Sequence, residues 1–130
     1  MNEVKREPAK SFKDLVVWQK AHQLVTGVYA ATRQFPKEEV FGLTSQFRRS
    51  AVSVAANIAE AFRKKSPQDK IRILNISQGS LSETEYYIIL AQDLKYMGVE
   101  MLSNQANEVG KLLESYMQTI GKNKILNPKY

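Results

Sequence analysis

The amino-acid sequence predicts an all-α protein, folded as an antiparallel up-down four-helix bundle. Three observations lead to this fold. Apolar residues recur at the helical period in four long stretches, short connections with proline or glycine separate these stretches, and the sequence carries no β-hairpin signal. Helices joined by short connections pack as antiparallel neighbours, and a chain of 130 residues suits one compact domain.

The first helix is expected to run from Ser11, an N-cap candidate with Asp14 three residues later, to about Arg33. Residues 1–10 are polar and basic, and are expected to form a flexible basic arm. The apolar residues of this helix span about 200°, more than the roughly 100° that one neighbouring layer needs. The excess predicts that a second subunit covers part of the helix. The two apolar stripes are Leu15, Trp18, His22, Val25 and Tyr29, and Val17, Ala21, Leu24, Val28 and Ala31.

The second helix is expected from about Leu43 to Phe62, after Pro36 has ended the first helix. Its sequence contains few of the long charged side chains that mark a solvated face. This pattern suggests polar groups that are held against another helix. A basic turn of residues 63–65 follows it.

The third helix is expected to begin at Ser66-Pro67, an N-cap followed by proline at the first helical position. It is expected to end at about Met97, with Gly98 as the C′ residue. Gly79 lies inside this helix, where glycine costs about 1 kcal/mol relative to alanine. That cost predicts a close approach of another backbone at Gly79.

The fourth helix is expected from about Met101 to Ile120, where the apolar residues form one clean stripe, and Gly121 ends it. The bundle is therefore expected to occupy residues 11–121. Residues 122–130 are expected to form a polar tail.

A short polar stripe follows the second helix within an arc of about 100°, and consists of Gln46, Arg49, Ser50, Ser53, Asn57 and Glu60. A turn near residues 65–66 makes the second and third helices antiparallel, so that facing residues have numbers that sum to about 132. Because buried charges are rarely left unpaired, this register predicts an interhelical polar network rather than a solvated face. The facing pairs are Arg49 with Glu83, Ser53 with Gly79-Ser80, Asn57 with Ile76, and Glu60 with Arg72.

Several motifs occur in order over roughly residues 12–120: residues 15–21, Phe35-Pro36, residues 41–51, Ser53, residues 57–60 and residues 79–83. In these motifs the sequence resembles a bacterial four-helix-bundle family whose members are often labelled as proteins encoded in intervening sequences of large-subunit ribosomal RNA. This family is similar to the accessory variability proteins of diversity-generating retroelements. Where the family usually has glycine after the Asn-Ile-Ala-Glu run, this chain has Ala61, so the second helix is expected to continue further.

The resemblance implies a four-helix protomer and a ring-shaped homopentamer. For the retroelement relatives it implies binding to a reverse transcriptase and to nucleic acid. The expected partners are therefore further copies of this chain, RNA or DNA, and a reverse transcriptase or another RNA-handling protein.

Net charge, apolar runs and cysteine content indicate which partners and which location to expect. Lysine and arginine outnumber aspartate and glutamate by 19 to 13, which gives a net charge of +6. A basic balance favours acidic partners such as RNA, DNA or anionic lipid, although it also occurs in proteins without such a partner. No membrane association is expected, because no run of about 18 apolar residues is present. The absence of cysteine and of an apolar signal-peptide core leads us to expect a cytoplasmic protein.

Catalytic, cofactor-binding and metal-binding residues are not expected, and the protein is expected not to be an enzyme. His22 is the only histidine, and a packed or hydrogen-bonded role is favoured because a metal site needs further ligands. Glu60 and Glu83 each have a basic partner in the predicted register, so structural ion pairs are favoured over acid–base catalysis. The serines of the stripe lack a nearby histidine base.

The basic residues suggest a phosphate-contacting surface, with an ordinary solubilising surface as the alternative interpretation. The leading hypothesis is a non-enzymatic homo-oligomeric bundle that binds nucleic acid as an adaptor for an RNA-handling partner. The alternative is a protein-interaction scaffold without a nucleic-acid role. The predicted nucleic-acid-binding residues are Arg48, Arg63, Lys64, Lys65 and Lys70.

Overall fold

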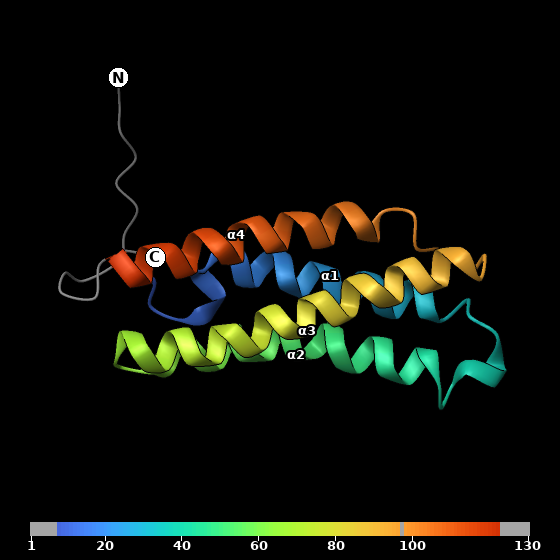
Figure 1. Ribbon diagram of the computed structural model, residues 1–130, viewed down its shortest axis with the longest axis horizontal. Coiled ribbons are helices and arrows are strands. Elements are labelled where there is room, and N and C mark those ends of the chain that lie inside the picture. The colour runs from blue at the N-terminus through green and yellow to red at the C-terminus, as the bar shows by residue number, and fades with distance from the viewer. Residues whose placement is uncertain (1–7, 97, 123–130) are drawn as a thin grey trace, which may run out of the picture.

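The computed structural model describes residues 8–96 and 98–122. Four α-helices run alternately in opposite directions and pack as a closed ring of neighbours, α1 on α2, α2 on α3, α3 on α4 and α4 on α1 (Figure 1). The predicted antiparallel four-helix bundle is therefore confirmed. In chain order the elements are η1 (Phe12–Asp14), α1 (Val16–Thr32), η2 (Lys37–Glu39), α2 (Leu43–Arg63), α3 (Pro67–Asp93) and α4 (Leu102–Lys122).

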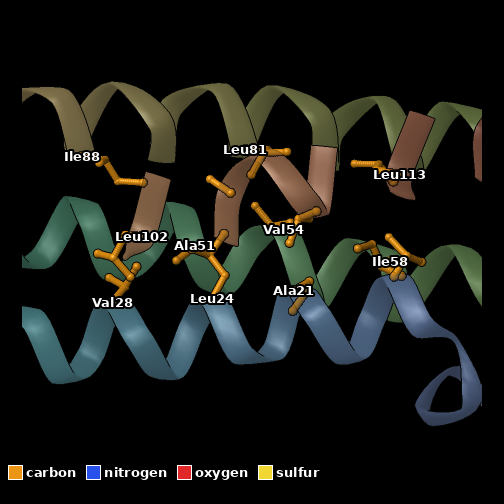
Figure 2. Close-up of a cluster of buried hydrophobic side chains, with 14 of the residues drawn as sticks. Ala21, Leu24, Val28, Ala51, Val54, Ile58, Leu81, Ile88, Leu102 and Leu113 are labelled. Atoms are coloured by element: carbon orange, nitrogen blue, oxygen red, sulfur yellow. The ribbon is translucent and has the colours of Figure 1, made fainter. Parts of the chain in front are cut away.

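All four helices turn apolar side chains into one core, part of which Figure 2 shows. One of the two stripes predicted on α1, that of Val17, Ala21, Leu24, Val28 and Ala31, is buried throughout. Of the other stripe only Leu15 is buried, and its remaining members are partly or fully exposed. The protomer therefore leaves apolar surface on α1 uncovered, as the width of the two stripes predicted.

The beginning of α1 differs from the prediction. Ser11 does form a capping box with Asp14, but this box closes the single 3₁₀ turn η1. Leu15 then adopts an extended conformation, with φ −77° and ψ 126°, and the α-helix begins at Val16. The extended conformation of Leu15 allows its side chain to reach the core, where it is buried. The capping box supplies hydrogen-bond partners to backbone amides of the preceding turn.

The end of α3 also differs. The helix ends at Asp93 instead of Met97, and a left-handed Lys95, with φ 62°, takes the C′ position expected for Gly98. The Tyr96 amide donates to the Ala91 carbonyl at 2.9 Å, which completes a Schellman motif. The Tyr96 hydroxyl then donates to Glu39 Oε2 at 2.7 Å. This tertiary hydrogen bond to η2 stabilises the early end of the helix.

Three glycines differ from what the sequence predicted or left open. Gly79 is exposed, and a Cβ built there would meet no atom within 4 Å, so the predicted close approach does not occur within the protomer. The close approach is instead at Gly27 of α1, where a Cβ would lie 2.9 Å from Leu102 Cδ2 of α4. Gly98, with φ +88°, lies against Ala31 in the connection between α3 and α4.

The remaining boundaries agree closely with expectation. Helix α2 passes Ala61 and ends at Arg63, so it does continue beyond the position of the family glycine. Helix α4 extends to Lys122, the first residue of the predicted tail. Residues 1–7 of the predicted arm and residues 123–130 of the predicted tail lie outside the described residues. Within the described chain, no helix combines the length and the hydropathy needed to cross a membrane.

Candidate nucleic-acid interface

Helices α2 and α3 meet in the register that the sequence predicted. Arg49 Nη2 donates to Glu83 Oε2, and its Nε donates to Gln46 Oε1 at 3.1 Å. About one turn further along, the hydroxyls of Ser53 and Ser80 lie 2.7 Å apart. The network thus links side chains of α2 and α3 over successive turns.

Asn57 belongs to the same network through its own helix. Its amide donates to the Ser53 carbonyl at 2.8 Å and to the Ser53 hydroxyl at 3.0 Å. The Ser53 hydroxyl is therefore shared between Asn57 on α2 and Ser80 on α3. This sharing fixes the Asn57 side chain along α2 instead of across the interface.

The most deeply buried part of the network involves two residues that were not predicted. Thr84 Oγ1 lies 2.8 Å from Ser50 Oγ, and Ser77 Oγ donates to the Val54 carbonyl at 2.8 Å. Ser50, Ser77 and Thr84 are fully buried. Ser77 and Thr84 lie three and four residues from Ser80 along α3, and this spacing is the sequence signal that could have predicted them.

The ion pair lies at the exposed edge of the network. The side chains of Arg49 and Glu83 are 52% and 38% exposed. Tyr87 donates to Glu83 Oε2 at 3.1 Å, and burial together with this carboxylate raises the pKa of the Tyr87 hydroxyl. Hydroxyls occupy the interior of the α2–α3 interface and charges its margin, which limits the cost of desolvation.

The second predicted ion pair does not form. Arg72 Nε lies 3.8 Å from Asp69 Oδ1, one turn earlier on α3, and no ion pair joins Arg72 to Glu60 among residues 8–96 and 98–122. Asp69 competes successfully because it lies on the same helix at a spacing of three residues. Glu60 itself is exposed on α2.

Two of the five residues predicted to contact phosphate are engaged with their own bundle. The Arg48 guanidinium lies 4.5 Å from the centre of the Tyr29 ring, and its Nε donates to Thr32 Oγ1 at 2.8 Å. Arg48 is also roughly 22 Å along α2 from Arg63, at 1.5 Å per residue. These contacts fix Arg48 in the α1–α2 interface, away from the basic turn.

Lys70 serves as a cap for α2. Its Nζ donates to the carbonyls of Phe62 at 2.9 Å and Ala61 at 3.3 Å. Burial lowers the pKa of Lys70. A cation at this position satisfies terminal carbonyls and complements the negative end of the helix dipole. This capping role accounts for the charge of Lys70 without a phosphate contact.

The other three residues are adjacent in the sequence: Arg63 is the last residue of α2, and Lys64 and Lys65 lie in the turn between α2 and α3. Within the described part of the chain, none of them forms an ion pair. This turn lies at the same end of the bundle as η1 and the end of α4 (Figure 1). We define the basic end by these six residues: Lys10, Lys13, Arg63, Lys64, Lys65 and Lys122.

The remaining candidate groups are metal ligands and His22. Across residues 8–96 and 98–122, no three or more His, Cys, Asp or Glu side chains are grouped to hold a metal ion. His22 is exposed on α1, and its ring stacks on Trp18 at a centroid distance of 5.1 Å, so it packs through this ring contact instead of in the core. The stacking follows from the spacing of four residues on α1.

Comparisons with known proteins agree with the fold and the motifs. Residues 13–115 match the model of the family described as 23S rRNA-intervening sequence protein. A solved structure from Bacteroides thetaiotaomicron, a protein with unknown function from the S23 ribosomal protein family, is similar with 32% sequence identity and a TM-score of 0.73. That similarity covers 82% of this chain and 99% of the other. No match was found among curated proteins. The family model spans most of the bundle, so this chain belongs to the 23S rRNA-intervening sequence protein family.

Proposed function

We propose that this protein is a homo-oligomeric adaptor that binds RNA or DNA through its basic end. The observation that carries the proposal is the turn of residues 63–65, where three adjacent cations have no ion-pair partner in the described chain. Unpaired cations at this junction of α2 and α3 are available to neutralise phosphates. Lys13 lies in η1, Lys10 precedes it, and Lys122 ends α4, so these lysines add positive charge at the same end.

The proposed binding is to the sugar-phosphate backbone. Lysine presents a point charge without the fixed geometry that reads base edges. A single turn offers few contacts, so each protomer binds weakly. An oligomer would present several basic ends to one strand and raise the effective concentration of the second contact.

Self-association is the second part of the proposal, with the pentameric ring implied by the family resemblance as its expected form. Its support is the apolar stripe of α1, where Trp18, Val25 and Tyr29 remain partly exposed in the protomer. An adaptor of this kind needs no catalytic residues. A reverse transcriptase or another RNA-handling protein is its proposed partner, and the cytoplasm its proposed location.

The proposal is tested by fluorescence anisotropy with labelled single-stranded and duplex RNA and DNA at about 50 mM salt, where phosphate contacts are strong. The test variant is Lys64→Glu/Lys65→Glu. Arg63 is left unchanged because a carboxylate in the last turn of α2 would oppose the helix dipole. The matched control is Lys95→Glu/Lys111→Glu, which makes the same change in net charge away from the basic end.

We expect the parent and the control to bind and the test variant to lose most of its affinity. If the parent binds none of the four nucleic acids, the proposed contact is wrong. Equal losses in the two variants would mean that net charge alone, rather than the basic end, determines binding.

A protein-interaction scaffold is the second candidate function, and one observation favours it. Phe41 is 95% exposed beside a hollow in the surface of α1 and α2. Aromatic side chains are enriched in protein interfaces and rare as free surface groups. Retained partner binding in a variant that has lost nucleic-acid affinity would support this function.

A further inference from the structure

A hollow of about 690 Å³ opens between α1 and α2, with Lys37 of η2 at its border. It lies at the end of the bundle opposite the basic end, where α1 finishes and α2 begins (Figure 1). We call it the α1–α2 hollow. Its lining residues include four cations and no carboxylate: Tyr29, Thr32, Arg33, Phe35, Pro36, Lys37, Val40, Phe41, Thr44, Ser45, Arg48, Arg49 and Val52.

The hollow is both cationic and apolar. Arg33 and Lys37 form no ion pair with any described residue. Three apolar residues of the lining are exposed, Phe41 by 95%, Val40 by 48% and Val52 by 41%. A good occupant must therefore bring apolar side chains to cover these residues and carboxylates to meet the cations.

The chain carries such a surface itself, on the outer face of α3. Tyr86 and Ile89 are 57% and 53% exposed. Glu85 and Asp93 lie on the same face, four residues before and after Ile89, and neither joins an ion pair in the described part of the chain. We call these four residues the α3 patch. Its apolar and acidic character complements the α1–α2 hollow.

The two surfaces lie at the same level along the bundle but on different faces. The Arg49–Glu83 contact fixes the antiparallel register of α2 and α3, which brings Leu43, the first residue of α2, level with Ile89 at 1.5 Å per residue. Phe41 lies two residues before Leu43. Around α3, Ile89 lies about 120° from Glu83, the residue that faces α2. The α3 patch of one protomer therefore cannot contact its own hollow.

We propose that the α1–α2 hollow of one protomer binds the α3 patch of a second copy of this chain. The inference rests on the proposed self-association and assigns its surfaces. Each protomer would present its hollow to one neighbour and its patch to the other, which is a heterologous contact. Because hollow and patch are level, successive protomers stand side by side without a shift along the bundle axis. Such a contact favours a closed ring over a helical fibre.

The experiment uses one variant on each side of the contact. Phe41→Glu changes the hollow, and Ile89→Glu changes the α3 patch. Both side chains are at least half exposed in the protomer, so helical content measured by circular dichroism should equal that of the parent. Ile76→Glu is the matched control, because Ile76 lies on α3 outside the patch and is 50% exposed. Glu85→Lys/Asp93→Lys gives a second patch variant that leaves the apolar residues in place.

Size-exclusion chromatography with light scattering reports the mass of each variant. We expect the parent and Ile76→Glu to form oligomers, while Phe41→Glu and Ile89→Glu each fall to the 14.8 kDa of one chain. An equimolar mixture of Phe41→Glu and Ile89→Glu still contains one intact hollow and one intact patch. That mixture is expected to give a heterodimer of twice the single-chain mass.

Each other outcome overturns the inference. If the parent forms oligomers and Phe41→Glu and Ile89→Glu do so equally, self-association stands and these surfaces are wrong. If the mixture stays monomeric, the contact is not heterologous. A parent that is monomeric at all concentrations refutes both this inference and the proposed self-association. Binding of an unrelated acidic peptide by a monomeric parent would assign the hollow to another protein.

Discussion

Removal of the Arg49–Glu83 ion pair should cost little, and its effect should disappear in salt. The two side chains are 52% and 38% exposed, so water screens their attraction, and exposed pairs contribute about 0.2–1 kcal/mol in double-mutant cycles. For a domain of this size, 1 kcal/mol corresponds to a shift of about 4 °C in the midpoint of thermal unfolding. We therefore expect a coupling below about 1 kcal/mol between Arg49→Gln and Glu83→Gln.

The assay is urea unfolding followed by circular dichroism, for the parent, the two single variants and the double variant. Protein concentration is held constant, because self-association would change the apparent stability. In about 1 M sodium chloride the Debye length is about 3 Å, and the coupling should approach zero. A coupling above about 2 kcal/mol that persists in salt would show that the pair is desolvated, contrary to its exposure in the protomer.

Ser77→Ala provides the buried comparison for this cycle. The Ser77 hydroxyl is fully buried and donates to the Val54 carbonyl at 2.8 Å. Its loss should cost about 1 kcal/mol, the net value of an internal hydrogen bond. Because no charge is involved, this cost should be the same in low and high salt. A salt-dependent cost for Ser77→Ala would indicate that the salt effect on the ion pair is not electrostatic.

Three further predictions concern the caps and connections. Tyr96→Phe should lower the unfolding midpoint at neutral pH. The bond to Glu39 raises the pKa of Tyr96, so the stabilising effect of this bond is lost as pH rises through that pKa. The difference in midpoint between Tyr96→Phe and the parent should therefore shrink above about pH 10. A constant difference between pH 7 and 11 contradicts this. Gly79→Ala should stabilise the folded protein by about 1 kcal/mol. Gly98→Ala should destabilise it by about 1–3 kcal/mol, because φ at Gly98 is +88°. Urea unfolding that ranks the two variants in the reverse order would refute this. Lys70→Met should lower the free energy of unfolding by about 1 kcal/mol and leave nucleic-acid affinity unchanged in anisotropy titrations. A large loss of affinity would show that Lys70 contributes to nucleic-acid binding.

The fold could be predicted because its signals are local. Helix periodicity and the Ser66-Pro67 start define the helices, and the short turn before Ser66 sets the register of α2 against α3. That register placed Arg49 opposite Glu83 correctly. The end of α3 could not be predicted, because the residue that takes the left-handed position is Lys95. The hydrogen bond that accompanies it, from Tyr96 to Glu39, joins residues 57 positions apart in the sequence.

The candidate interface was harder to predict because a sequence shows charges but not their partners. Arg48 and Lys70 look equivalent to Lys64 and Lys65 in the sequence. In the structure, Arg48 packs on an aromatic ring and Lys70 binds carbonyls at the end of α2. Only packing between helices distinguishes a cation that supports the bundle from one that is free to bind a ligand.

The salt dependence of nucleic-acid binding tests the proposed role of the basic end most directly. On duplex nucleic acid, the logarithm of the observed binding constant falls with the logarithm of salt concentration, with a slope of about −0.9 for each phosphate contact. The Lys64→Glu/Lys65→Glu variant should show a slope that is shallower by up to about 2 for each protomer engaged. A variant with the same slope and the same affinity as the parent would contradict the assignment of these lysines to phosphate contacts.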